Sequence, residues 1–238
     1  MKVKKIISSI LLIAIFSFSF AVARIAAATK KQDVAAMVTQ IIGKMEVMKA
    51  GDTKWQKAKT GMFLAQGDKL RTGKRSKAAI MFSNGAEVKI NQSTEFDIES
   101  SEAGKSDTAR ITRGQATCAL RARKGGNMSF SVKTPVAVVS VRGTEFDTEV
   151  SGTGETTVLV VRGVVRFENE FGGVDVKENQ TAKATSGNPP GQPEDVPNDE
   201  MKKKQDWAEE IKIERKTLNL KVKTETGEEK TIRLKFKK

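Results

Sequence analysis

Residues 61–73, GMFLAQGDKLRTG, and residues 130–146, FSVKTPVAVVSVRGTEF, are the stretches that decide the fold. The first has the spacing G-x-x-L-x-x-G-D-x-L-x-T. The second reads as a strand, a Thr-Pro break, an apolar strand and then Arg-Gly-Thr. Both combine short apolar stretches with glycine, which adopts the backbone angles of sharp corners that other residues disfavour. These patterns predict short strands joined at glycine corners.

The same reading extends from about residue 34 to residue 185. Apolar and polar residues alternate, as at Val174 and Val176, with the period of a strand that has one buried face. Turn signals recur at short intervals, the sharpest being Asn84-Gly85. Their irregular spacing excludes a fixed-period solenoid, so we predict an all-β, rolled or β-helix-like sheet of many short strands. Three strand-like segments begin immediately after a glycine, at Gly43, Gly114 and Gly163.

The first 28 residues have the features of a secretory signal peptide. A basic start, Met-Lys-Val-Lys-Lys, precedes an apolar run over residues 6–23. Small residues follow at the positions that a signal peptidase reads, which predicts cleavage before Arg24 or Thr29. An uncleaved inner-membrane anchor is the alternative, because the run is nearly long enough to span a bilayer. Either way, the protein is expected to be periplasmic or secreted.

The composition favours an anionic environment and argues against most enzyme classes. The chain has 42 Lys and Arg against 29 Asp and Glu, and removing residues 1–28 leaves a net charge of about +9. This charge favours lipid headgroups or cell-wall polymers, and we do not expect nucleic acid for an exported chain. There is no histidine and only one cysteine, Cys118, so nucleophilic triads and His- or Cys-based zinc sites are excluded.

Carboxylate-pair chemistry remains open on composition alone. Glu95, Asp97, Glu145 and Asp147 alternate along two probable strands. The same spacing arises on the solvated face of any strand, and we favour that interpretation. We expect no catalytic residue, metal ligand or cofactor, and we expect Cys118 to be a buried small apolar residue.

Proline content divides the chain after residue 185. Four of the five prolines lie between Pro189 and Pro197, which predicts a linker over residues 186–197 between a domain at 34–185 and a tail at 198–238. A helix capped by Asn198 and running through Glu214 is expected, with Met201, Trp207, Ala208 and Ile211 on its apolar side. A β-hairpin follows, whose basic face is either a docking patch for an anionic surface or a solvated edge. That face carries Lys221, Lys223, Arg233, Lys235 and Lys237.

The stretch from about Gly43 to Ala184 resembles the FecR domain, an extracytoplasmic module of bacterial regulators. The resemblance implies an all-β fold and a role in interaction or signal transmission without enzymatic activity. Only five residues precede the apolar run, so we do not carry over the family's cytoplasmic segment that engages a sigma factor. The matching motif residues are Gly61, Leu64, Gly67, Asp68, Thr72, Gly85, Arg142, Gly143 and Thr144.

These motif residues are expected to be structural. The glycines serve as backbone corners, and Asp68 can accept backbone amides in a turn. Arg142 could tie strands together through Asp68 or another carboxylate, whereas the functional alternative makes Arg142 and Thr144 a ligand-binding pair. Trp55 is expected either in the core or as an exposed platform for sugar or lipid.

Two functions follow from the sequence. The first is an exported, non-enzymatic module for interaction or envelope signalling, whose partner is an unknown envelope protein. The second is an envelope scaffold that binds glycan or an anionic polymer through Trp55 and the basic tail. Membrane contact is expected only through an uncleaved anchor or through that tail.

Overall fold

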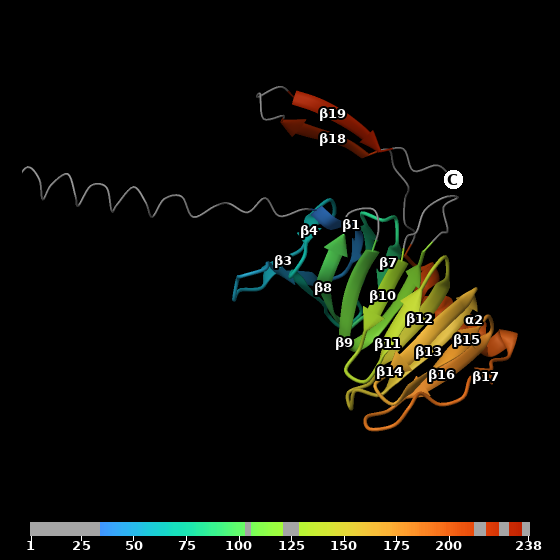
Figure 1. Ribbon diagram of the computed structural model, residues 1–238. Coiled ribbons are helices and arrows are strands. Elements are labelled where there is room, and N and C mark those ends of the chain that lie inside the picture. Colours follow the sequence, from blue (N-terminus) through green and yellow to red (C-terminus); the bar gives the residue numbers. More distant parts are fainter. Residues whose placement is uncertain (1–33, 103–105, 121–128, 212–217, 224–228, 235–238) are drawn as a thin grey trace, which may run out of the picture. The chain divides into compact units, whose positions relative to one another are not determined.

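The computed structural model describes residues 34–102, 106–120, 129–211, 218–223 and 229–234 (Figure 1). The predicted signal peptide lies outside these ranges. Within them the chain is all-β, as predicted, with a short helix and a hairpin after the main body. Strands β1 to β17 form one hydrogen-bonded sheet, which is folded over into two layers.

Each layer is an ordered row of short strands. Layer A has the order β4–β1–β6–β7–β9–β12–β13–β16–β17, and layer B has the order β3–β2–β5–β8–β9–β10–β11–β14–β15. The strands of layer A are β1 (Val34–Ile42), β4 (Phe63–Ala65), β6 (Lys77–Phe82), β7 (Glu87–Ile90), β12 (Glu145–Val150), β13 (Thr156–Arg162), β16 (Gln180–Ala184) and β17 (Glu194–Asp195). Those of layer B are β2 (Met45–Met48), β3 (Gln56–Lys57), β5 (Lys69–Thr72), β8 (Glu95–Glu102), β10 (Ser129–Lys133), β11 (Val138–Val141), β14 (Val164–Asn169) and β15 (Gly172–Lys177). Strand β9 (Ser106–Ala119) belongs to both layers, because it pairs with β8 up to Arg113 and with β12 from Gly114.

The chain passes between the layers at corners where the backbone angle φ is positive. The predicted corners at Gly43, Gly114 and Gly163 are confirmed, with φ of 80°, 97° and 92°. The corners move from one edge of the layers to the other halfway along the chain. The reason is that β10 runs parallel to β9, whereas β10 and β11 are antiparallel. One edge carries Gly43, Arg75, Ser93 and Gly114, and the opposite edge carries Gly143, Gly163 and Asn179.

Apolar side chains from both layers meet in a continuous core. Phe82 of layer A contacts two rings of layer B. Its ring centroid lies 6.5 Å from that of Phe96 and 5.0 Å from that of Phe130, the latter edge to face. Edge-to-face pairs of this kind add to the stabilisation that burial gives.

The helix α2 (Asn198–Glu209) lies on the outer face of layer A. Its N-cap is Pro197, one residue before the predicted cap, and no side chain caps it. Met201 packs on Leu159 of β13, whose side chain points away from the core of Val158 and Val160.

Two lysines of layer A hold the other end of α2. Lys89 Nζ donates a hydrogen bond of 2.7 Å to the Ala208 carbonyl in the last helical turn, and Lys77 Nζ lies 2.6 Å from Glu210. Positive charge at a helix C-terminus is favourable, because unpaired carbonyls give that end a partial negative charge.

The segment predicted as a linker is hydrogen-bonded to the body. The amide of Gly191 donates to the Lys183 carbonyl at 2.8 Å, and Asp195 of β17 pairs with Gln180 of β16. Strands β18 (Leu218–Lys223) and β19 (Glu229–Leu234) form the predicted hairpin. None of the described helices has the length and apolar character needed to cross a membrane.

Candidate interaction surface

Asp68 is a buried carboxylate that closes the turn before β5. Its Oδ1 accepts the amide of Ala50 at 3.0 Å, and its Oδ2 accepts the amide of Ala65 at 2.9 Å and Lys49 Nζ at 2.6 Å. Gly67 precedes it with φ of 87°, and a Cβ there would lie 2.9 Å from that of Ala50. Both carboxylate oxygens of Asp68 are therefore hydrogen-bonded within the chain.

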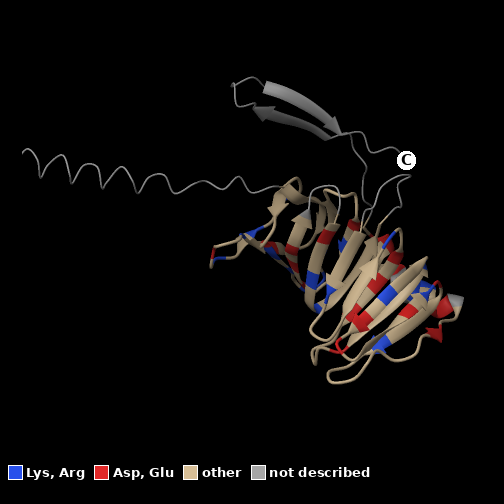
Figure 2. Cartoon of the chain, viewed as in Figure 1, with Lys and Arg blue, Asp and Glu red and all other residues tan. Residues whose placement is uncertain are grey.

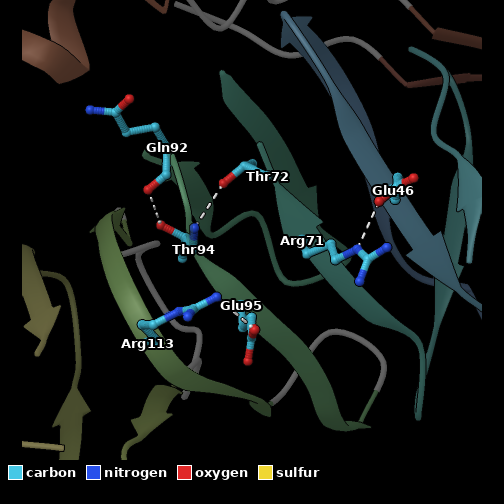
Figure 3. Close-up of polar contacts among 7 residues, drawn as sticks. All are labelled: Glu46, Arg71, Thr72, Gln92, Thr94, Glu95 and Arg113. Carbon is cyan, nitrogen blue, oxygen red and sulfur yellow. Dashed lines mark hydrogen bonds and ion pairs between the residues drawn. The ribbon is translucent and has the colours of Figure 1, made fainter. Parts of the chain in front are cut away.

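The motif threonine Thr72 occupies the next corner (Figure 3). Its Oγ1 donates to the Asn91 carbonyl at 2.6 Å and accepts the amide of Thr94 at 3.0 Å. Thr94 Oγ1 in turn donates to the Gln92 carbonyl at 3.1 Å and accepts the amide of Gln115 at the same distance. Successive corners are thus linked through threonine hydroxyls.

The second motif lies elsewhere in the fold. Thr144 is buried, and its Oγ1 donates to the Val164 carbonyl at 3.4 Å, whereas Arg142 is exposed. In layer B, β8, β9 and β10 separate β5 from β11, so Arg142 is not the partner of Asp68. The two motifs do not come together in one site.

The remaining motif residues lie at turns or in the core. Gly61, Gly85 and Gly143 have φ of 84°, 88° and 77°, and Leu64 is 1% exposed. This geometry favours the structural interpretation, which remains a prediction.

The outer face of layer B carries a ladder of alternating charge across β3, β2, β5, β8 and β9. The register places Lys57, Glu46, Arg71, Glu95 and Arg113 in one row. Arg71 Nε donates to Glu46 at 2.7 Å, and Arg113 donates to Glu95 at 2.9 Å (Figure 3). The hydrogen bond from Arg71, followed by that from Lys44, lowers the pKa of Glu46.

A second group of charges lies further along the same face. Glu99 accepts hydrogen bonds from Arg110 and lies 2.7 Å from Lys133 Nζ. Burial raises the pKa of Glu99, but the hydrogen bonds from these two cations outweigh it, so the net shift is downward. Asp97 differs, since burial raises its pKa against the opposing charges of Lys69 and Arg110.

Between the charges runs a row of short hydroxyl side chains. Thr108, Ser131 and Ser140 face one another across β9, β10 and β11, and all three are partly exposed. The Oγ atoms of Ser131 and Ser140 lie 3.3 Å apart. This flat, polar strip is bordered by Arg110 and Lys133.

Trp55 is partly exposed beside the ladder rather than packed in the core. The guanidinium carbon of Arg71 lies 4.2 Å from its ring centroid. A cation stacked on an aromatic face is attracted by the ring quadrupole, and here it occupies one face of the indole.

One interpretation of the carboxylates needs correction. Asp147 was expected on a solvated strand face, yet it is 4% exposed and accepts hydrogen bonds from Gln115 at 2.9 Å and Thr117 at 2.8 Å. It lies in register with Lys89 and Leu159, which both contact α2. Helix α2 therefore lies across this face and shields it from solvent.

The ladder was not predicted from the sequence. Its signal was present, since Glu46, Arg71 and Arg113 occupy polar positions of alternating strands, but the strand register that aligns them could not be read locally. Among the described residues, no cluster of His, Cys, Asp or Glu has the geometry to hold a metal ion.

The fold and these surfaces define an all-β module of folded-over hairpins, and part of its sequence matches a known family. Residues 68–166 match the FecR protein family, so the chain contains a FecR domain. This range holds β5 to β13 and begins at Asp68.

Solved structures agree on the fold. Two crystal structures of a candidate anti-sigma factor from Parabacteroides distasonis ATCC 8503 each align with a TM-score of 0.50 and 15% sequence identity. The alignment covers 66% of this chain and 68% of theirs. No curated protein matches the sequence.

Proposed function

We propose that this protein is an exported, non-enzymatic FecR-like module that binds an envelope protein and takes part in envelope signalling. The FecR match supports a regulatory class of protein. The similar structures of a candidate anti-sigma factor agree with a protein partner rather than a small-molecule substrate.

The observation that carries the proposal is the difference between the two outer faces. Helix α2 shields layer A over β13 and β7. Its Met201 packs on Leu159, and the carbonyl of its Ala208 accepts a hydrogen bond from Lys89. In layer B the strip of Thr108, Ser131 and Ser140 remains accessible. Short hydroxyl side chains lose little rotamer entropy when a partner covers them, and the flanking charges can fix its register.

Site-specific cross-linking in living cells tests this surface. A photoreactive amino acid at Ser131 or Ser140 is expected to capture a discrete envelope protein. The matched control carries the same group at Lys183, an exposed residue of layer A, and is expected to capture none. Adducts from all three positions alike, or from none, would contradict a partner surface on layer B.

Export is tested separately. N-terminal sequencing of protein from the envelope fraction should give Arg24 or Thr29 as the first residue. An intact Met1 species held in the inner membrane would favour the anchor instead.

The alternative function is a scaffold for glycan or anionic polymer. It is favoured by the partial exposure of Trp55 and by the hairpin, in which Lys221 and Lys223 alternate with Leu220. Arg233 lies on the opposing strand, while Lys235 and Lys237 lie outside the described residues. Recovery of wall polymer or lipopolysaccharide, rather than protein, in pull-downs from envelope fractions would support it.

A further inference from the structure

A group of basic side chains gathers where β1 turns into β2 and β5 turns into β6. The segments that carry them are hydrogen-bonded side by side: the amide of Ala58 donates to the Met45 carbonyl, and that of Gly73 to the Lys44 carbonyl, each at 2.9 Å. The members are all exposed, and we call them the cationic corner: Lys44, Lys57, Lys59, Lys74 and Arg75.

The cationic corner is nearly uncompensated. Glu46 is its one carboxylate neighbour in the hydrogen-bonded strands, and it is shared between Lys44 at 3.2 Å and Arg71 at 2.7 Å. Within the described parts of the chain, the other four cations of the corner have no carboxylate within the 4.0 Å of an ion pair. Their charge is therefore available to an anionic partner.

The opposite end of the stack carries both signs of charge, as Figure 2 shows, but its carboxylates outnumber its cations, which are Arg166, Lys177 and Lys183. Strands β14 to β17 and their turns present exposed carboxylates at Glu168, Glu170, Asp175, Glu178, Glu194 and Asp195. Because the strands lie in a row, the two ends are separated by the length of the sheet. Such a charge distribution orients a protein beside a charged surface.

We propose that the cationic corner docks the domain end-on against a bilayer that carries anionic lipid headgroups. Four of its five charges are lysines, which act as point charges on flexible stems rather than as shaped bidentate donors. This suits a fluid layer of phosphates better than a single ligand. The adjoining Trp55 is partly exposed, and tryptophan favours the membrane interface.

The partner is also consistent with the N-terminal sequence. The apolar run over residues 6–23 is predicted to bring the chain to a membrane during export. The strand that follows, β1, lies at the same end of the stack as β2 and β3. This inference goes beyond the proposed function, because it concerns the end of the sheet and not the strip on layer B.

Vesicle cosedimentation tests the proposal with residues 24–238, which retain the whole compact unit from Asp33 to Lys238. Each basic residue near an anionic surface strengthens binding about fivefold. Reversing four charges, Lys57→Glu, Lys59→Glu, Lys74→Glu and Arg75→Glu, should weaken binding to phosphatidylglycerol-containing vesicles at least about tenfold. The matched control reverses the same number of exposed charges elsewhere: Lys177→Glu, Lys183→Glu, Lys202→Glu and Lys203→Glu.

The control variant should bind within about threefold of wild type, and both variants should melt like wild type. Equal loss in the two variants would mean that net charge alone decides binding, and the proposal would be wrong. It would also be wrong if wild type failed to bind anionic vesicles, or bound purified wall polymer instead. Cross-linking from Ser131 should persist in the corner variant, which separates this test from that of the proposed function.

Discussion

Gly114 lies so close to Thr94 that a Cβ at position 114 would fall 2.4 Å from the Oγ1 of Thr94 and 2.6 Å from its Cα. Gly114 also has φ of 97° at the point where β9 leaves layer B for layer A. Two requirements therefore coincide at one residue. The backbone must adopt a left-handed angle, and it must pass in contact with the neighbouring corner.

Gly114→Ala is expected to destabilise the domain by about 3 kcal/mol or more, because strain at φ and overpacking against the Thr94 backbone add. The control is Gly51→Ala, where φ is 85° and nothing lies within 4 Å. It should cost about 1–2 kcal/mol from the backbone angle alone. Urea denaturation of both variants measures the difference, and equal losses would mean that the close approach is unimportant.

Asp68→Ala is expected to cost about 2–4 kcal/mol, since it leaves the buried amide of Ala65 and the partly buried amide of Ala50 without acceptors. Lys49→Met removes the cation and its hydrogen bond to the Phe63 carbonyl, and it should cost less, about 1 kcal/mol, because Lys49 is partly exposed. Thermal melts of the two variants test this order. A larger loss from Lys49→Met would mean that the ion pair, rather than the amides, holds the turn.

The strand content and the corners could be predicted because both depend on local sequence. Alternating apolar residues identify a half-buried strand without knowledge of its neighbours, and glycine marks positive φ. Nearly continuous apolar runs, such as those at residues 158–161 and 136–141, indicate strands covered on both faces. Leu159 of β13 is covered by Met201, as this pattern predicts. The run at 136–141 is not covered on both faces, since Ser140 of β11 faces outward and stays partly exposed.

The site could not be predicted because it depends on partners distant in sequence. Asp68 was one of the carboxylates that Arg142 could have met, but the cation beside Asp68 is Lys49, which β2 brings alongside β5. Asp147 was expected in solvent, and a helix some 55 residues later covers it. Register and docking are set by long-range packing, which the pattern of a single strand does not contain.

Cys118 is expected to be unreactive in the folded protein. It is 1% exposed, and burial, assisted by the charge of Asp147, raises its thiol pKa well above the ordinary value. The thiolate is the reactive form, so a thiol reagent at pH 8 should modify the residue only in denaturant. Stoichiometric labelling of native protein within minutes would contradict this packing.

The charges on layer B predict opposite effects of two substitutions on acid stability. The pKa of Glu99 is lowered from 4.5 in the folded protein, so its stabilisation is present above about pH 4.5 and is lost as pH falls through the folded pKa. Glu99→Gln should lower the free energy of unfolding by about 1 kcal/mol at pH 7. The difference from wild type should shrink towards pH 3.

The pKa shift of Asp97 has the opposite sign, because burial is the main influence and raises that pKa from 3.8. The folded protein then holds the proton more tightly than the unfolded chain, so stability is lost as pH rises through the folded pKa. Asp97→Asn should therefore gain stability relative to wild type at pH 7 and match it more closely below pH 3.8. Urea denaturation at pH 3, 5 and 7 measures both variants. If the two substitutions changed stability in the same direction at pH 7, the assignment of Glu99 as the ion-paired carboxylate and Asp97 as the desolvated one would fail.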